Sequence, residues 1–224
     1  MPSPVVADNG RPVRAKICGL TRAQDAAVAV AAGADYLGVV FAGGPRGVTA
    51  QGAAEVRAAA GGVPVFGVFG EQAVDEILRV SRAAGLAGAQ LHGTYRPEDA
   101  ARLRAEGLRV WRVVRLAGPD DLGLLRESAA EADAVLVEPR VPHATGGTGI
   151  TLDQALACEA RTRLAGATMV LAGGLTHKTV AVAVALVRPD IVDVSSGVES
   201  LPGIKDPDKI ARFLEAVVGH SAIS

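Results

Sequence analysis

Five side chains that could bind a ligand or transfer a proton stand at or just after the ends of short apolar segments. They are Cys18, Arg46, His92, Glu138 and Asp193. A carboxyl and a thiol can serve as the acid and the base of a proton transfer, and a guanidinium can bind a carboxylate through two hydrogen bonds. The pattern therefore favours one shared site.

Each of the five also has a structural interpretation. A cysteine that ends a strand is commonly a small buried hydrophobe, and His92 could be a hydrogen-bonded histidine at a rim. Arg46 could be a solvated charge, because the Gly-Gly-Pro run before it marks a surface loop. Asp193 lies between two valines. Because burying an unpaired carboxylate is costly, we expect Asp193 to be functional or hydrogen-bonded.

Two glycine-containing segments favour a phosphate ligand. They hold Gly173 and Gly174, and Ser195, Ser196 and Gly197. Glycine lets backbone N–H groups approach an anion closely, and successive loops of a parallel barrel often build a phosphate site. A third run, which includes Gly147, could be a lid, a substrate-enclosing loop or a plain connection.

The elements that must position these residues alternate regularly from Val13 onward. Short β-branched runs alternate with longer alanine-rich stretches of helical period, which is typical of a parallel α/β fold. The predicted strands are Val13–Cys18, Tyr36–Phe41, Pro64–Phe69, Ala89–His92, Arg109–Leu116, Asp133–Glu138, Thr168–Ala172 and Ile191–Ser195. Eight such units predict a single (β/α)8 TIM barrel, whose chemistry lies at the carboxyl ends of the strands. The alternative, an open doubly wound sheet, would usually carry a GxGxxG turn that is missing here.

Helix boundaries are also marked in the sequence. Thr21, Thr49, Thr151 and the segment 97–99 are predicted helix starts, because their side chains can accept bonds from first-turn N–H groups. Glycine ends a helix in a left-handed conformation at least cost. The predicted helix ends are Gly33, Gly61, Gly85, Gly107 and Gly166.

Length and composition predict one soluble cytoplasmic domain. The 224 residues fit a flexible N-terminal extension over 1–12 and one barrel over 13–224. A net charge of -1 without a basic stripe argues against nucleic-acid binding. The two distant cysteines indicate neither disulfides nor a zinc site. No apolar run is long enough to predict a membrane span.

Seven separated motifs resemble those of the phosphoribosylanthranilate isomerase family, from Lys16 to about Phe213. They are Lys16–Thr21, Pro45-Arg46 with Val48-Thr49, Gly67–Phe69, Gln90–Gly93, Gly146–Gly149, Ala172–Leu175 and Asp193–Glu199, followed by Pro202-Gly203 and Lys205-Asp206. The resemblance implies an enzyme of tryptophan biosynthesis. It would convert N-(5-phosphoribosyl)anthranilate by an Amadori rearrangement into 1-(2-carboxyphenylamino)-1-deoxyribulose 5-phosphate, without a metal or cofactor, as a monomer or homodimer.

The resemblance also implies roles for individual residues. Cys18 would be the base, Glu138 would stand in the place of the acid, and Asp193 would support the reacting sugar or the base. Arg46 would hold the anthranilate carboxylate. The remaining substrate-binding predictions are His92, Gly147 and Ser195, with Gly173, Gly174, Ser196 and Gly197 for the phosphate.

The sequence departs from the family pattern on the sixth predicted strand. The family reads Leu-Leu-Asp there, with the aspartate as acid, whereas this chain reads Val-Leu-Val-Glu. The extra methylene moves the carboxyl by about an ångström, and such a misplacement can cost roughly a hundredfold in rate. Ile150 also replaces a usual lysine. We expect Glu138 to be the acid, with Asp133 and His143 as less favoured substitutes.

Two other functions stay open on the sequence alone. One is a broad-specificity phosphosugar isomerase, but such barrels typically use aspartates at strands one and five, where this chain has Cys18 and Arg115. The other is a non-catalytic barrel that binds a phosphate-bearing ligand, which the lost aspartate and lysine would favour.

Overall fold

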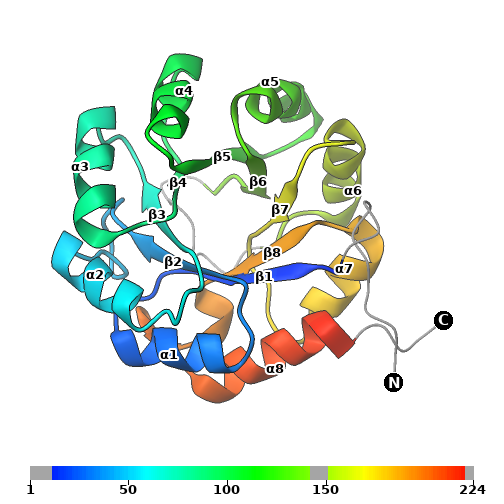
Figure 1. The fold of residues 1–224 in the computed structure, drawn as a ribbon. Coiled ribbons are helices and arrows are strands. Elements are labelled where there is room, and N and C mark those ends of the chain that lie inside the picture. Colours follow the sequence, from blue (N-terminus) through cyan, green and yellow to red (C-terminus); the bar gives the residue numbers. More distant parts are fainter. Residues whose placement is uncertain (1–11, 142–150, 220–224) are drawn as a thin grey trace.

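A computed structural model describes residues 12–141 and 151–219 of the chain. Eight parallel strands form one closed barrel in sequence order, and helices surround it (Figure 1). The strands are β1 (Arg14–Ile17), β2 (Tyr36–Val40), β3 (Val65–Phe69), β4 (Gly88–Leu91), β5 (Arg109–Leu116), β6 (Ala134–Pro139), β7 (Met169–Leu171) and β8 (Ile191–Val194). The helices are α1 (Ala23–Ala31), α2 (Ala50–Ala58), α3 (Val74–Ala84), α4 (Pro97–Ala105), α5 (Leu124–Glu131), α6 (Gln154–Arg163), α7 (Val180–Val187) and α8 (Pro207–Val218).

The predicted TIM barrel is confirmed. Each predicted strand agrees with the observed strand to within one residue at either end. The described elements run from Arg14 to Val218. The division of the chain at residue 12 stays a prediction, because residues 1–11 lie outside the described part.

Alternate residues of each strand point into the barrel, where they form a packed core rather than a channel. Tyr36, Phe66 and Trp111 contact one another with ring centroids 4.3–5.8 Å apart, and Leu136 belongs to the same buried cluster. These residues lie early in their strands. They close the amino end of the barrel. The polar residues further along each strand therefore rest on a packed layer of buried side chains.

Several predicted helix boundaries are confirmed. Thr49 caps α2 by accepting a hydrogen bond from a first-turn N–H group, and Pro97 begins α4, with the Asp99 carboxylate accepting from the backbone N–H before it. All five glycines predicted to end helices have φ between 54° and 95°. Local capping chemistry therefore fixes these boundaries.

Two predicted helix starts are wrong. α1 begins at Ala23, and the Thr21 hydroxyl donates to the Gly203 carbonyl instead of capping the helix. α6 is capped by Asp153 rather than by Thr151. In the first case the local spacing predicted a cap, but the Thr21 hydroxyl bonds a backbone carbonyl that is distant in the sequence.

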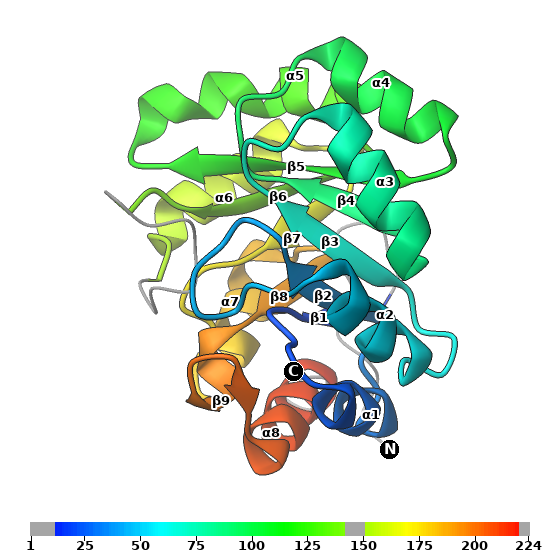
Figure 2. The same ribbon diagram turned by 90° about the vertical axis from the view of Figure 1, so that its left-hand side faces the viewer.

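Short elements after β5 and β8 were not predicted. They are the 3-10 helices η1 (Pro119–Gly123) and η2 (Ser196–Val198) and an antiparallel hairpin of β9 (Glu199–Leu201) and β10 (Ile204–Lys205). Figure 2 shows β9 beside the amino end of α8. A Cβ added at Gly203, in the turn of this hairpin, would lie 3.0 Å from the Pro45 carbonyl oxygen. The hairpin therefore packs against the loops that follow β1 and β2.

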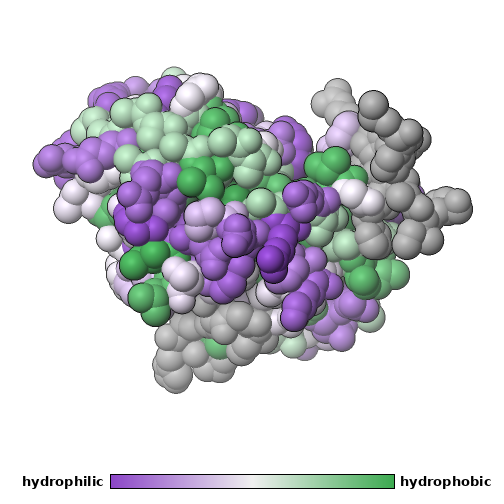
Figure 3. All heavy atoms as spheres, turned by 90° about the horizontal axis from the view of Figure 1, so that it is seen from below, coloured by the Kyte–Doolittle hydropathy of each residue, from purple (hydrophilic) through white to green (hydrophobic). Residues whose placement is uncertain are grey.

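The outer surface carries no single dominant apolar face in the view from below. Hydrophilic and hydrophobic residues are interspersed there, over the side on which α1 and α8 lie (Figure 3). None of the helices within residues 12–141 and 151–219 is long and apolar enough to cross a membrane.

Candidate active site

Six of the predicted site residues line one small cavity at the carboxyl ends of the strands. The cavity has a volume of about 110 Å³. Its lining includes Cys18, Arg46, His92, Glu138, Asp193 and Ser195. The thiol and both carboxyl residues are buried, with exposed fractions of 6–8%. In the part of the chain that the structure describes, no group of three His, Cys, Asp or Glu side chains could hold a metal ion.

A buried lysine for which no role was predicted lies beneath this cavity. Lys16 is fully buried, and its Nζ donates to Asp193 Oδ1 at 2.9 Å and to Gln90 Oε1 at 3.0 Å. Strands β1 and β8 pair in parallel with Lys16 opposite Asp193. The carboxylate that we expected to be functional or hydrogen-bonded is therefore paired with a cation.

The Cys18 thiol shares the environment of this ion pair. Burial raises the pKa of Cys18 above its ordinary value of 9.0 and Asp193 raises it further, whereas Lys16 opposes both. Burial would lower the pKa of Lys16, but the interactions with Asp193 and Cys18 outweigh it and raise that pKa. In the free protein the thiol is therefore mostly protonated at neutral pH.

Gly38 on β2 leaves the space that this pair of side chains occupies. A Cβ at this position would lie 2.8 Å from Cys18 Sγ and 3.0 Å from Lys16 Nζ. Real Cβ atoms do not approach other atoms so closely without displacing them. A side chain at position 38 would therefore displace the thiol or the ammonium group.

Glu138 lies on the opposite wall of the site, where β5 and β6 pair with Arg115 opposite Glu138. Arg115 Nε donates to Glu138 Oε1 at 3.2 Å, and His92 Nδ1 lies 3.7 Å from the same oxygen. Burial raises the pKa of Glu138 to about 7, and the positive charge of Arg115 limits the rise. A carboxyl with such a pKa can donate a proton near neutral pH.

Of the two substitute acids considered above, Asp133 does not line this cavity. Asp133 lies at the amino end of β6, where its carboxylate accepts from the Val110 N–H. His143 lies outside the described residues, as do Ile150 and the predicted substrate-binding residue Gly147.

His92 is a neutral imidazole that lies between the side chains of Gln90 and Arg115. Its Nε2 lies 3.0 Å from Gln90 Nε2, and its Nδ1 lies 3.0 Å from Arg115 Nη2. Burial lowers the pKa of His92 to about 3, and the positive charges of Arg115 and Lys16 add to this effect. His92 is therefore part of the polar wall rather than a charged group.

Arg46 is fixed by an ion pair rather than being a mobile loop charge. Its Nε and Nη2 donate to the two carboxylate oxygens of Glu199 at 2.8 and 2.7 Å. Lys205 Nζ also donates to Glu199, at 2.8 Å. Burial would raise the pKa of Glu199, but the bonds from Arg46 and Lys205 outweigh it and lower that pKa. Nη1 and one N–H of Nη2 are not used by Glu199, so Arg46 keeps donors for an anion.

The two loops predicted to bind phosphate are in direct contact. Gly173 and Gly174 follow β7 with φ of 92° and 62°, which favours glycine at both positions. A Cβ at Gly197, in the loop after β8, would overlap the Leu175 carbonyl oxygen. Ser196 is half-buried beside it. The close packing of these two loops therefore depends on Gly197.

Five residues that contact or surround these side chains had no predicted role. They are Lys16, Gly38, Arg115, Glu199 and Lys205. The period of two along a strand places Lys16 on the same face as Cys18, and a buried carboxylate needs a partner. Together these two arguments could have predicted Lys16 as the partner of Asp193. The partner of Glu138 could not be found in this way, because it depends on the register between β5 and β6.

The comparisons with known proteins agree with the resemblance. The family model described as N-(5'-phosphoribosyl)anthranilate (PRA) isomerase matches residues 15–216. A relative of that name from Symbiobacterium thermophilum is 41% identical, over 91% of this chain and 97% of the relative.

Solved structures are similar throughout the chain. A structure of monomers of the dimeric phosphoribosylanthranilate isomerase from Thermotoga maritima has a TM-score of 0.81 and 33% identity, and covers 92% of this chain and 98% of its own. A phosphoribosylanthranilate isomerase in complex with reduced 1-(o-carboxyphenylamino)-1-deoxyribulose 5-phosphate has a TM-score of 0.80 and 32% identity, with the same coverage.

Proposed function

The chain belongs to the N-(5'-phosphoribosyl)anthranilate isomerase family, and on that premise we propose how its residues perform the reaction. Its activity is the isomerisation of N-(5'-phosphoribosyl)anthranilate in tryptophan biosynthesis. The reaction opens the ribose ring to a Schiff base, removes the proton at C2 to give an enolamine, and adds a proton at C1, which leaves a ketone at C2. It needs an acid at the ring oxygen and a base at C2.

The substrate is held by its two anionic ends. The loops that contain Gly173-Gly174 and Ser196-Gly197 provide backbone N–H groups for the phosphate. Arg46 binds the anthranilate carboxylate through the donors that Glu199 leaves unused. Ser195 and His92 line the cavity between these ends.

Glu138 is the acid that opens the ring. Its proton passes to the furanose oxygen while the C1–O bond breaks and the nitrogen lone pair forms the Schiff base. The contacts of Arg115 and His92 are both to Oε1, which leaves Oε2 as the oxygen that carries the proton. A pKa of about 7 keeps a useful protonated fraction at neutral pH.

Cys18 is the base that removes the C2 proton, with Lys16 stabilising the thiolate. Because the pKa of Cys18 is raised above 9.0 while that of Glu138 is about 7, few free molecules hold a thiolate and a protonated Glu138 together. Asp193 keeps Lys16 in place and so supports the base.

The observation that carries this assignment is the placement of Cys18 and Glu138 around one cavity. Turnover of N-(5'-phosphoribosyl)anthranilate should fall by roughly a hundredfold or more in Glu138→Gln and in Cys18→Ser. Cys158→Ser is the matched control. Cys158 lies on α6, and its thiol contacts the Leu186 carbonyl, so this variant should keep normal turnover.

Each outcome of this assay discriminates between functions. Normal turnover in either active-site variant would refute the assigned role. A wild-type protein that binds the substrate without converting it would instead be a binding barrel. We further propose that the protein acts in the cytoplasm on this small molecule, as a monomer or a homodimer. The dimeric relative from Thermotoga maritima supports the second form.

A further inference from the structure

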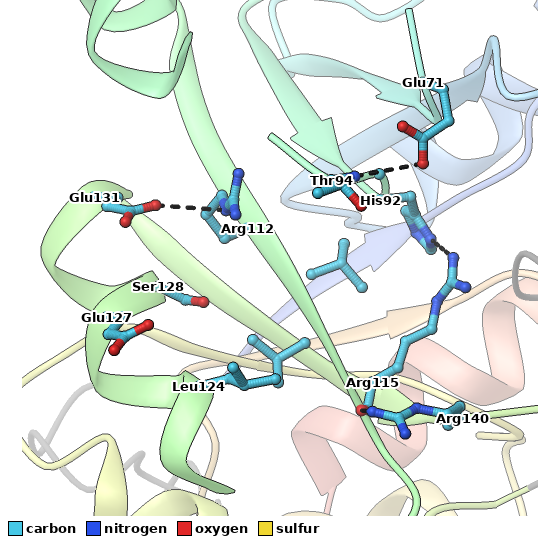
Figure 4. A pocket seen from close by; sticks show the side chains of 13 residues that line it. Glu71, His92, Thr94, Arg112, Arg115, Leu124, Glu127, Ser128, Glu131 and Arg140 are labelled. Carbon is cyan, nitrogen blue, oxygen red and sulfur yellow. Dashed lines mark hydrogen bonds and ion pairs between the residues drawn. The ribbon is translucent and has the colours of Figure 1, made fainter. Parts of the chain in front are cut away.

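Arg115 is the one charged group that touches both Glu138 and His92 among the described residues. It lies on β5, and Figure 4 shows its side chain extending toward the His92 imidazole on the neighbouring strand end. Its Nε donates to Glu138 Oε1 at 3.2 Å, while its Nη2 lies 3.0 Å from His92 Nδ1. A single guanidinium therefore links two walls of the cavity.

This link matters because Glu138 has a longer side chain than the aspartate it replaces. A glutamate has one more rotatable bond, so a fixed carboxyl position requires an additional contact. The paired register of β5 and β6 supplies that contact from directly opposite. The planar guanidinium also restricts the orientation of the carboxyl more than a lysine ammonium would.

The surroundings assign the proton to Glu138 rather than to its neighbours. His92 contacts Gln90 and Arg115 and is neutral, because burial and the nearby positive charges lower its pKa to about 3. Arg115 itself stays charged. Because its positive charge favours the ionised carboxylate, Arg115 opposes the effect of burial on Glu138.

We propose that Arg115 is a positioning residue for the general acid, which fixes the carboxyl of Glu138 and governs how readily it releases its proton. This inference rests on the proposed role of Glu138. It assigns to Arg115 the task of making a glutamate effective where the family pattern has an aspartate.

The test is steady-state kinetics of Arg115→Gln and Arg115→Lys as a function of pH. In Arg115→Gln, kcat should fall by about ten- to a hundredfold, with KM changed by less than about threefold. The inflection of kcat/KM that belongs to Glu138, near pH 7 in the wild type, should move to higher pH because the ionised carboxylate has lost its partner. Arg115→Lys keeps the charge, so it should restore the inflection and part of kcat.

Two further variants make the result decisive. Arg140 bonds Asp121 and the Arg115 carbonyl, so Arg140→Gln changes a neighbouring arginine without touching Glu138 and should leave kinetics unchanged. Arg115→Gln combined with Glu138→Gln should be no slower than Glu138→Gln alone, because the two residues act as one unit.

Several outcomes would overturn the inference. These are an unchanged kcat and inflection in a folded Arg115→Gln, a loss confined to KM, or additive losses in the double variant. If Arg115→Gln does not fold, a wild-type kcat in Arg115→Lys would overturn it as well, because the planar guanidinium would then not be needed to orient the carboxyl. Full activity of Glu138→Gln would instead refute the proposed function, so the two failures are distinguishable.

Discussion

Replacing Glu138 by glutamine should stabilise the protein at neutral and alkaline pH while it impairs catalysis. Glu138 is 7% exposed, and its pKa rises from 4.5 to about 7 on folding. Below pH 4.5 both the folded and the unfolded chain hold the proton, so ionisation has no effect on stability. Between pH 4.5 and about 7 the unfolded chain loses the proton and the folded chain keeps it. Stability therefore falls as pH rises through this window.

The size of the effect follows from the pKa change. A tenfold change in proton affinity is worth about 1.4 kcal/mol, so the rise from 4.5 to about 7 corresponds to about 3 kcal/mol once the pH exceeds 7. Glutamine cannot ionise, so the variant escapes this loss. The difference in unfolding free energy between variant and wild type should grow by about 3 kcal/mol from pH 4.5 to pH 8.

Urea denaturation of both proteins at intervals between pH 4.5 and pH 8 measures this difference. A constant offset would reflect altered packing of the amide, and only the change with pH reports on ionisation. A difference that stays flat, or that favours the wild type as pH rises, would show that Glu138 ionises as easily in the folded chain as in the unfolded one. Its suitability as an acid near pH 7 would then be lost as well.

Three further substitutions test other parts of the site. Lys16→Met should destabilise the fold by about 3–5 kcal/mol in thermal or urea unfolding, because it leaves the buried Asp193 carboxylate unpaired; a loss below about 1 kcal/mol would contradict the buried pairing. Gly38→Ala should reduce kcat by tenfold or more, because its Cβ would displace Cys18 Sγ; unaltered kinetics would mean that the thiol has room to move. Arg46→Lys should raise KM by roughly tenfold with a smaller change in kcat, because a lysine cannot reproduce the forked contact; an unchanged KM would argue against a substrate contact.

Local patterns predicted the fold because the residues within each strand, and the glycine after each helix, set the conformation of that segment. β-branched runs and five glycines with left-handed φ needed no knowledge of distant residues. Thr21 shows where this approach fails, since its hydroxyl bonds Gly203 rather than its own helix. Thr21 and Thr49 both precede a predicted helix. Only Thr49 caps its helix, because the Thr21 hydroxyl bonds a distant carbonyl instead.

The site was predictable to the extent that it consists of strand ends. Cys18, Glu138 and Asp193 were predicted to lie together because they end or nearly end apolar runs, and they line one cavity. Their partners were not, because pairs such as Arg115 with Glu138 are set by the register between strands. Arg46 was predicted to lie at the site. Its ion pair with Glu199 was not predicted, because Glu199 belongs to a hairpin after η2 that the sequence did not indicate.

The ion pair between Lys16 and Asp193 spans 177 residues and lies at the seam where β8 closes the barrel against β1. During synthesis the ribosome releases the lysine long before its carboxylate exists. A nascent chain that has not yet produced β8 would have to bury an ammonium group without a counterion, which disfavours a closed, misregistered barrel of seven strands. Correct closure of the barrel thus becomes favourable only when β8 brings Asp193 to Lys16.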